Sequence, residues 1–282
     1  MGSKTALTIL LYCLSIAPMY ARSPCIYALG DSLTAAYAPE LATRLPEIEV
    51  INAGLGGQSS RSIAARAGAI PVTVVMDVRT PSLDGLTIKS VQPEILAFSG
   101  LNAAVEGKLS GVPGRLSWNR ATGYRFQPRT ATPRGTAAEN SKFEADPSAF
   151  ADCTLVLWAG RNGFQRVDDV LSDIAAIVLH WRTQRFYILS IPNAADEPRG
   201  SASYAQIQAI NEALHSKYND NYLDIRRALI DRGNTLECQP TCTSNADDII
   251  PVALRSDRIH LNLHGNRFVA ETIRDLILGQ HH

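Results

Sequence analysis

Short apolar runs alternate with stretches of helical periodicity along most of the chain, and this alternation restricts the fold more than any other feature. Two apolar runs, residues 25–29 and 154–159, each stop at a glycine, as buried parallel strands do. The apolar spacing from Val167 onward predicts a helix over 167–181. We therefore predict an α/β fold with a doubly wound parallel sheet. Further strands are expected at 49–52, 186–191 and 222–225, and further helices at 38–45, 60–67, 204–218 and 263–278.

The segment from about 71 to 130 has a different pattern. Helical periodicity disappears, and apolar residues alternate with polar ones between turn dipeptides such as Asp84-Gly85 and Pro113-Gly114. The alternating apolar residues are Val72, Val74, Met76, Val78, Leu116, Trp118, Tyr124 and Phe126. This pattern predicts a small β-rich insertion, followed by a polar loop over 130–148. The expected domain arrangement is a signal peptide at 1–21, a first core part at 22–70, the insertion at 71–135 and a second core part at 136–282.

The first 21 residues differ from the rest of the chain. Lys4 precedes an almost uncharged apolar run at 6–17, and small and polar residues follow it. This pattern predicts a secretory signal peptide, with cleavage after Ala21 and a secreted or periplasmic protein. The run is shorter than the roughly 20 apolar residues of a membrane-spanning helix, so no stable membrane anchor is expected. The alternative interpretation is an uncleaved anchor or a core segment.

The charge balance and the cysteine content indicate which partners and which cellular compartment fit this chain. The chain has 27 basic and 27 acidic side chains and no basic run interleaved with aromatic residues, which argues against a nucleic-acid partner. After the predicted cleavage four cysteines remain: Cys25, Cys153, Cys238 and Cys242. An even number in an exported protein fits two disulfides, with three possible connectivities. The alternative is buried free thiols.

Two short motifs supply a candidate nucleophile and a candidate acid–base pair. Gly30-Asp31-Ser32 directly follows the first predicted strand, at the sheet edge where doubly wound folds bind ligands. A serine hydroxyl needs a base to become a nucleophile. Near the other end, Asp257 stands three residues before His260 and can orient its ring. Each motif alone also has a non-catalytic interpretation. The first fits a polar turn, and the second fits an exposed Asp–His pair.

His264 forms a His-x-x-x-His pair with His260, a spacing that can bind zinc on a helix. The pair lacks the glutamate of the metalloprotease motif and an evident third ligand. No metal site is therefore expected.

Two further motifs offer hydrogen-bond donors for a developing oxyanion. A glycine-rich turn that includes Gly57 follows the second predicted strand, and Asn162 follows the strongest one. Acyl transfer needs donors of this kind, a backbone N–H at close approach and a side-chain amide. Glycine and asparagine also favour ordinary strand-ending turns, which is the alternative interpretation of both motifs.

Together, the four motifs resemble those of the SGNH (GDSL-type) hydrolases. The resemblance implies a flavodoxin-like sheet, a triad of Ser32, His260 and Asp257, and an oxyanion hole from Ser32, Gly57 and Asn162, with no cofactor. The sequence departs from the family pattern in two places. Gly163 replaces the Asp that follows the family's Asn, and the stretch between Gly57 and Gly160 is much longer than the family needs. The α/β-hydrolases, a rival class, place serine in a Gly-x-Ser-x-Gly elbow, which is not found here.

The resemblance predicts an exported serine esterase that acts on carboxylic esters through an acyl-enzyme. Export and the aromatic residues of the insertion favour an acetylated polysaccharide as substrate, although these rings equally fit the insertion's own core. One alternative is a lipid or acyl-chain esterase. Another, from a different class, is a non-catalytic glycan-binding protein on an SGNH scaffold. The sequence makes no prediction of oligomeric state.

The flavodoxin-like order that the resemblance implies also suggests a disulfide pairing. It sets the first core strand beside the third, so Cys25 and Cys153 would lie at the amino ends of neighbouring strands. Cys238 would then pair with Cys242 within one loop. The insertion contains none of the four motifs, so we expect it to influence substrate choice and to be dispensable for the chemistry.

Overall fold

A computed structural model describes residues 24–77, 85–97, 102–130, 140–181, 185–237 and 246–279. The predicted signal peptide, Val78, Cys238 and Cys242 lie outside these ranges. The strands are β1 Cys25–Gly30, β2 Glu49–Gly54, β3 Val72–Met76, β4 Leu86–Gln92, β5 Ala103–Leu109, β6 Val112–Asn119, β7 Gly123–Pro128, β8 Asn140–Ala145, β9 Thr154–Trp158, β10 Phe186–Leu189 and β11 Tyr222–Leu223. The α-helices are α1 Ser32–Arg44, α2 Ser60–Arg66, α3 Val167–Trp181, α4 Ala202–Tyr218, α5 Ile225–Glu237 and α6 Leu263–Leu278.

The core is a five-stranded parallel sheet with the order β11-β10-β9-β1-β2. Counted within the core alone, this is the flavodoxin-like order, so the predicted fold class is confirmed. β1 lies between β2 and β9, with Gly30 beside both Gly54 and Trp158. The chain leaves β1, β2 and β9 at the same edge of the sheet, which brings together the three segments that follow them.

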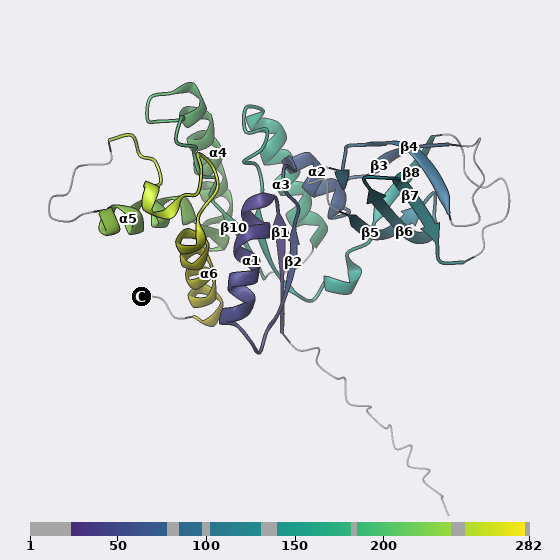
Figure 1. Cartoon of the computed structure of the whole chain (residues 1–282), viewed down its shortest axis with the longest axis horizontal. Helices are drawn as coiled ribbons and strands as arrows, with labels where there is room; N and C mark the ends of the chain where they lie inside the picture. The colour runs from purple at the N-terminus through teal and green to yellow at the C-terminus, as the bar shows by residue number, and fades with distance from the viewer. Residues whose placement is uncertain are drawn as a thin grey trace, which may run out of the picture.

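Helices cover both faces of the sheet, as the alternating apolar pattern requires (Figure 1). Side chains of α1, α5 and α6 pack against one face in a cluster that includes Tyr37, Leu229 and Val269. Side chains of α2, α3 and α4 pack against the other face, with Ile63 and Ile174 among them. β1 contributes to both clusters because successive strand residues point to opposite faces.

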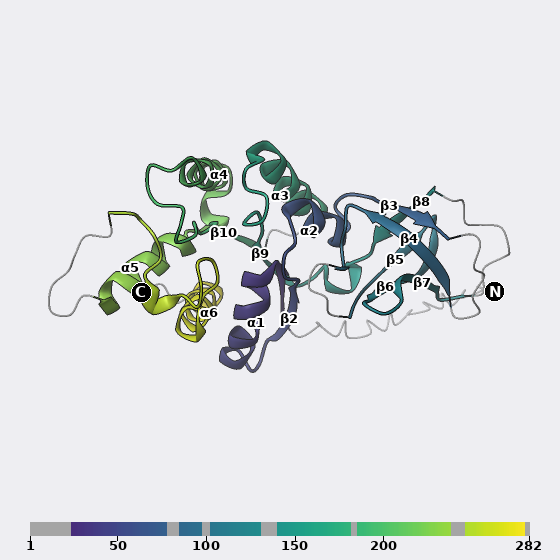
Figure 2. The same ribbon diagram turned by 45° about the horizontal axis from the view of Figure 1, so that its top comes forward.

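The insertion forms a closed barrel with the strand order β3-β4-β7-β6-β5-β8. It lies at one end of the molecule, beyond α2 (Figures 1 and 2). Its interior is apolar, with Leu116, Phe126 and Phe143 buried. Tyr124 is buried in the same cluster and Trp118 is partly buried against it, so these rings belong to the barrel core.

The strand β8 corrects the prediction of a loop over 130–148. It pairs with β3 and β5 and so closes the barrel, which extends ten residues past the expected boundary at 135. The inward residues Ser141, Phe143 and Ala145 alternate with charged or polar ones. Only Phe143 is strongly apolar, and therefore the period of two is weak in the sequence.

Two helices also differ from the prediction. α1 begins at Ser32 instead of residue 38, because Asp31 caps it and Leu33, Tyr37 and Leu41 form its buried stripe. α5 was not predicted. Its sequence is rich in charged residues, and few of its side chains are apolar enough to reveal a helical face.

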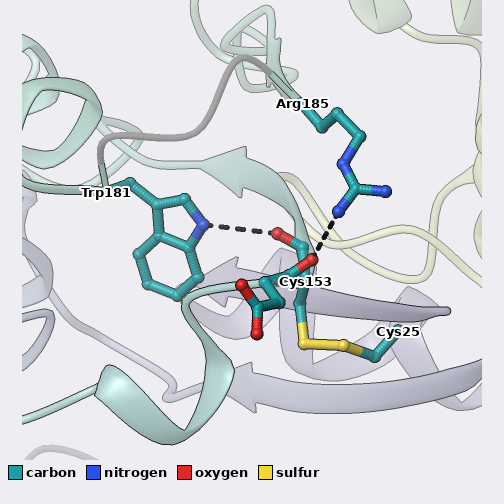
Figure 3. Close-up of a disulfide and its surroundings, with 5 residues drawn as sticks. Cys25, Cys153, Trp181 and Arg185 are labelled. Atoms are coloured by element: carbon teal, nitrogen blue, oxygen red, sulfur yellow. Dashed lines mark hydrogen bonds between the residues drawn. A yellow bond between two sulfur atoms is a disulfide. The ribbon is translucent and has the colours of Figure 1, made fainter. Parts of the chain in front are cut away.

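A disulfide joins Cys25 to Cys153, with their Cα atoms 4.7 Å apart, and confirms this predicted pairing. Both residues lie at the amino ends of adjacent strands. Nearby, the Trp181 indole N–H donates to the carbonyl of Cys153, as Figure 3 shows. The bond closes a chain segment of 128 residues that contains the whole barrel. By chain entropy alone, a loop of this length corresponds to about 4 to 5 kcal/mol of stabilisation.

Candidate active site

Ser32 occupies the first position of α1, directly after β1 and its capping residue. The Asp31 carboxylate accepts the Leu33 N–H at 2.9 Å and so fixes the start of the helix. The first N–H groups of a helix have no partner within the helix. The Ser32 backbone N–H therefore belongs to the electropositive helix terminus, and its side chain is partly exposed at the sheet edge.

Asp257 and His260 lie on a tight loop between η4 (Val252–Leu254) and α6. The Ser256 N–H donates to the carbonyl of His260 at 2.9 Å and closes the loop. One Asp257 oxygen, Oδ1, accepts the backbone N–H groups of Ile259 and His260, both at 2.7 Å. The three-residue spacing thus folds the carboxylate back onto the following backbone.

The predicted triad residues meet in a chain of two hydrogen bonds. Asp257 Oδ2 lies 2.8 Å from His260 Nδ1, and His260 Nε2 lies 2.9 Å from Ser32 Oγ. The hydrogen bonds from the His260 backbone and ring hold the pKa of Asp257 well below its usual range. An ionised carboxylate only accepts, so Nδ1 carries the ring proton and Nε2 is free to accept the Ser32 hydroxyl proton.

The glycine-rich turn, residues 55–58, lies next to Ser32. The Gln58 N–H donates to the Leu55 carbonyl at 3.4 Å, which makes a β-turn. Gly57 has a φ of +81° at the third turn position, where a side chain would be strained. A Cβ placed on Gly56 would lie 3.6 Å from the Cβ of Ser32, so the turn runs close to the serine.

Asn162 joins these segments. Its Nδ2 donates to Asp31 Oδ2 at 3.2 Å and to the Gln58 carbonyl at 3.0 Å. These contacts hold Asn162 without the family's following Asp. The residue at that place, Gly163, has a φ of +92°, which explains why glycine stands there. Because both amide hydrogens are engaged, Asn162 must release one of them to bind an oxyanion.

Sequence reasoning singled out Asp31 only as part of a motif, whereas the structure gives it two contacts in the site. Its side chain is buried, and desolvation raises its pKa to about 6, although the Leu33 N–H and the nearby His260 and Arg161 oppose the shift. The hydrogen bonds to Leu33 and Asn162, which the sequence does not show, reveal that Asp31 supports the site.

We expect the stability of wild type relative to Asp31→Asn to fall as the pH rises from about 4 to about 8. The raised pKa means that the folded state binds the proton more tightly, so the stabilisation is full below about pH 4 and is lost as the pH rises through about 6. A shift of about two units corresponds to roughly 3 kcal/mol at most. Asparagine keeps one oxygen for the Leu33 N–H and cannot ionise. Its amide nitrogen would face Asn162 Nδ2 donor to donor, a cost that does not depend on pH. Urea unfolding of both proteins between about pH 4 and 8 measures the difference, and a difference that does not change with pH would contradict the expectation.

Arg161 is a further residue that the sequence analysis missed, although it stands between Gly160 and Asn162. Its side chain is buried, pairs with Glu197 at 2.8 Å and lies over the Phe164 ring. The loop that carries Glu197 also contacts the loop of Asp257 and His260, because the Ala195 N–H donates to the Arg258 carbonyl at 2.8 Å. The buried ion pair therefore supports the segment that presents His260.

No group of three or more metal-ligating side chains occurs among the described residues. Both ring nitrogens of His260 are engaged by Asp257 and Ser32, while His264 is exposed in the first turn of α6. Within the ranges described above, no helix has the length and apolar character needed to cross a membrane.

Several solved structures resemble this chain at low sequence identity, and the first of those below supports the fold. A lipase/acylhydrolase from Enterococcus faecalis superposes with a TM-score of 0.50 at 12% identity, over 91% of this chain and 96% of that one. A G-D-S-L family lipolytic protein from Veillonella parvula superposes with a TM-score of 0.48 at 12% identity, over 90% of this chain and 98% of that one. A gut microbial diltiazem-metabolizing enzyme gives 0.45 at 12% identity, over 92% of this chain but 46% of its own length.

No protein-family model and no curated protein matches the sequence. The chain has the α/β fold of the SGNH hydrolases, and the resemblance predicted from the four motifs is confirmed at the level of the fold.

Proposed function

We propose that the protein is a serine hydrolase that cleaves carboxylic esters, with Ser32 as nucleophile. The observation that carries this proposal is the continuous chain of hydrogen bonds from Asp257 through His260 to the Ser32 hydroxyl. This arrangement has the nucleophile, base and orienting acid of a serine triad. The intact chain also argues against a purely glycan-binding protein on this fold.

The mechanism has two acyl-transfer steps. His260 Nε2 accepts the hydroxyl proton while Ser32 Oγ attacks the ester carbonyl, and Asp257 stabilises the resulting imidazolium. The backbone N–H groups of Ser32 and Gly57 and the side chain of Asn162 stabilise the oxyanion. His260 then donates its proton to the leaving alkoxide. In the second step, His260 takes a proton from water, which attacks the acyl-enzyme carbonyl. His260 then returns this proton to Ser32 Oγ as the bond to the acyl group breaks and the acid leaves.

The exposure of the site suits an ester carried on a large molecule, and we propose an acetylated polysaccharide as the first candidate substrate. The Asp257 and His260 side chains are 53% and 42% exposed, so the alcohol side of the substrate is not confined around them. Tyr124 and Phe126 are buried in the barrel and provide no sugar-stacking surface. A lipid ester is the second candidate.

The Cys25–Cys153 disulfide supports the export that the apolar N-terminal run predicts. Disulfides of this structural kind persist in oxidising compartments, outside the cell or in a periplasm. We therefore propose that the protein acts after secretion.

We expect Asn162→Ala to lower kcat by about 10² to 10³, the usual effect of removing one oxyanion donor. Kinetics with a small nitrophenyl ester measure the loss. Asn221, whose amide donates to a backbone carbonyl far along the chain, offers a matched control as Asn221→Ala. A loss smaller than about threefold would show that Asn162 is not a donor in this protein.

A substrate panel tests the proposal. Nitrophenyl esters of increasing acyl length are assayed beside acetate release from acetylated polysaccharides. Fast cleavage of acetyl esters with little turnover of long chains would support a glycan deacetylase, and the reverse would support the lipid alternative. Binding of the polysaccharide without any ester cleavage would instead favour the glycan-binding alternative.

A further inference from the structure

The glycine turn (residues 55–58) contacts the barrel in two ways: Leu55 packs against the barrel's apolar cluster, and the buried side chain of Gln58 forms a hydrogen bond to it. Gln58 Nε2 donates to the carbonyl of Ile95 at 2.6 Å, and Ile95 belongs to the segment that follows barrel strand β4. Gln58 and Ile95 are both fully buried. The hydrogen bond therefore joins the core to the insertion in a buried contact, where it is stronger than at the surface.

The other end of the Gln58 carboxamide is held by the core. Its Oε1 accepts from Arg66 Nε at 2.9 Å and Nη2 at 2.7 Å. The same Nη2 donates to the carbonyls of Gly30 and Ala53, at 3.1 and 2.9 Å. Arg66 thus binds the ends of β1 and β2 to Gln58, and Gly30 is two residues before Ser32.

The Gln58 backbone connects the side-chain contacts of this residue to the proposed oxyanion donors. Its carbonyl accepts from Asn162 Nδ2 at 3.0 Å, and its N–H closes the turn that contains Gly57. One residue is therefore bonded to the barrel, to the Arg66 guanidinium and to Asn162, and it directly follows Gly57.

The barrel segment that supplies the Ile95 carbonyl is itself fixed. The Tyr124 hydroxyl, from strand β7, accepts the Leu96 N–H at 2.7 Å and donates to the Glu94 carboxylate. Glu94 also accepts the N–H groups of Leu96 and Ala97, both at 3.0 Å. These contacts lock the backbone on both sides of Ile95.

We propose that Gln58 is a positioning residue for the oxyanion donors and that the barrel takes part in catalysis through its contact with Gln58. This inference rests on the proposed esterase function. A small displacement of a catalytic group can cost up to about 10²-fold in rate, and Gln58 restrains both Gly57 and Asn162. The insertion is then required for the chemistry, in contrast to the expectation from the sequence.

The test is a double-mutant cycle measured on active enzyme. We expect Gln58→Leu to lower kcat by about 10- to 100-fold per active site, with KM for a small nitrophenyl ester changed less than about threefold. Tyr124→Phe lies in the barrel and removes only the hydroxyl, so we expect a smaller loss of about 3- to 10-fold. If both act through Ile95, the double variant loses about as much as Gln58→Leu alone.

Active-site titration with a fluorophosphonate separates positioning from folding. A purely structural role would lower the titrated fraction and the melting temperature and leave kcat per titrated site unchanged. Gln127 is exposed on β7, so Gln127→Leu is the matched control and should keep wild-type kinetics. If Gln58→Leu does not fold, Gln58→Glu is used instead, because it keeps an oxygen for Arg66 and loses the donor to Ile95.

The outcomes distinguish the two proposals. A wild-type protein that neither hydrolyses esters nor reacts with the fluorophosphonate refutes the proposed function. An active wild type with unchanged kcat per site in Gln58→Leu, or with fully multiplicative losses in the double variant, overturns the role of Gln58 and the barrel alone.

Discussion

Replacing Ser32 with alanine is expected to lower kcat/KM for a small ester by at least about 10⁴-fold while the fold remains intact. The variant removes the only atom that forms the acyl-enzyme in the proposed mechanism. In serine hydrolases, loss of the nucleophile leaves only the weak catalysis supplied by binding and the oxyanion hole. Alanine is a good helix former, so it suits the first position of α1. The hydrogen bond from the Leu33 N–H to the capping residue Asp31 does not involve the Ser32 side chain.

The measurement compares Ser32→Ala with wild type on a nitrophenyl ester, after circular dichroism has established that both are folded. Ser216, exposed on α4, provides the control Ser216→Ala, which should have full activity. Near-normal turnover by a homogeneous Ser32→Ala preparation would refute the assignment of the nucleophile.

We expect the second largest effect, a loss of about 10³- to 10⁴-fold in kcat, from Asp257→Asn. Asparagine keeps an oxygen that can accept the two backbone N–H groups now bound by Asp257 Oδ1. Its amide nitrogen, however, would face His260 Nδ1 with a donor. The imidazole would then carry its proton on Nε2, where it cannot accept the proton of Ser32.

Asp196 gives a matched control for this variant. It is an exposed carboxylate that pairs, at 2.7 Å, with Arg258, which lies between Asp257 and His260 in the chain. We expect Asp196→Asn to change kcat by less than about threefold, since exposed ion pairs contribute little. An Asp257→Asn enzyme that is less than about tenfold impaired would show that Asp257 does not orient His260 in this protein.

The residues of the proposed triad could be singled out from the sequence because each belongs to a short local motif. Ser32 follows a strand of six residues that are all buried, and its motif is short. The acid and the histidine are three residues apart, so one loop brings them together without help from distant segments. The parallel sheet was predictable for a similar reason, since buried strands such as β9 have a continuous apolar sequence.

The supporting contacts could not be predicted, because they depend on partners far away in the sequence. Gln58 and Ile95 are 37 residues apart, and Asn162 and Asp31 are 131 apart. Strand β8 was missed because its register is set by pairing with β3 and β5, while its own sequence contains a single strongly apolar residue. Polar contacts between distant elements have no periodicity that a sequence could reveal.

The contact between Gln58 and the barrel also bears on engineering. A variant that replaces the barrel with a short linker would expose the buried carboxamide of Gln58 and remove its Ile95 acceptor. Under the proposed role of Gln58, deletion of the insertion would change the chemistry as well as substrate choice, and point substitutions such as Tyr124→Phe are the better probe of the barrel.

The most direct measurement for the central claim is covalent labelling of the active serine. The wild-type protein is treated with a fluorophosphonate, digested and mapped by mass spectrometry. We expect a single phosphonyl adduct on Ser32, which is absent from Ser32→Ala and forms far more slowly in Asp257→Asn. No adduct in the wild type, or an adduct on another residue, would contradict a Ser32–His260–Asp257 active site.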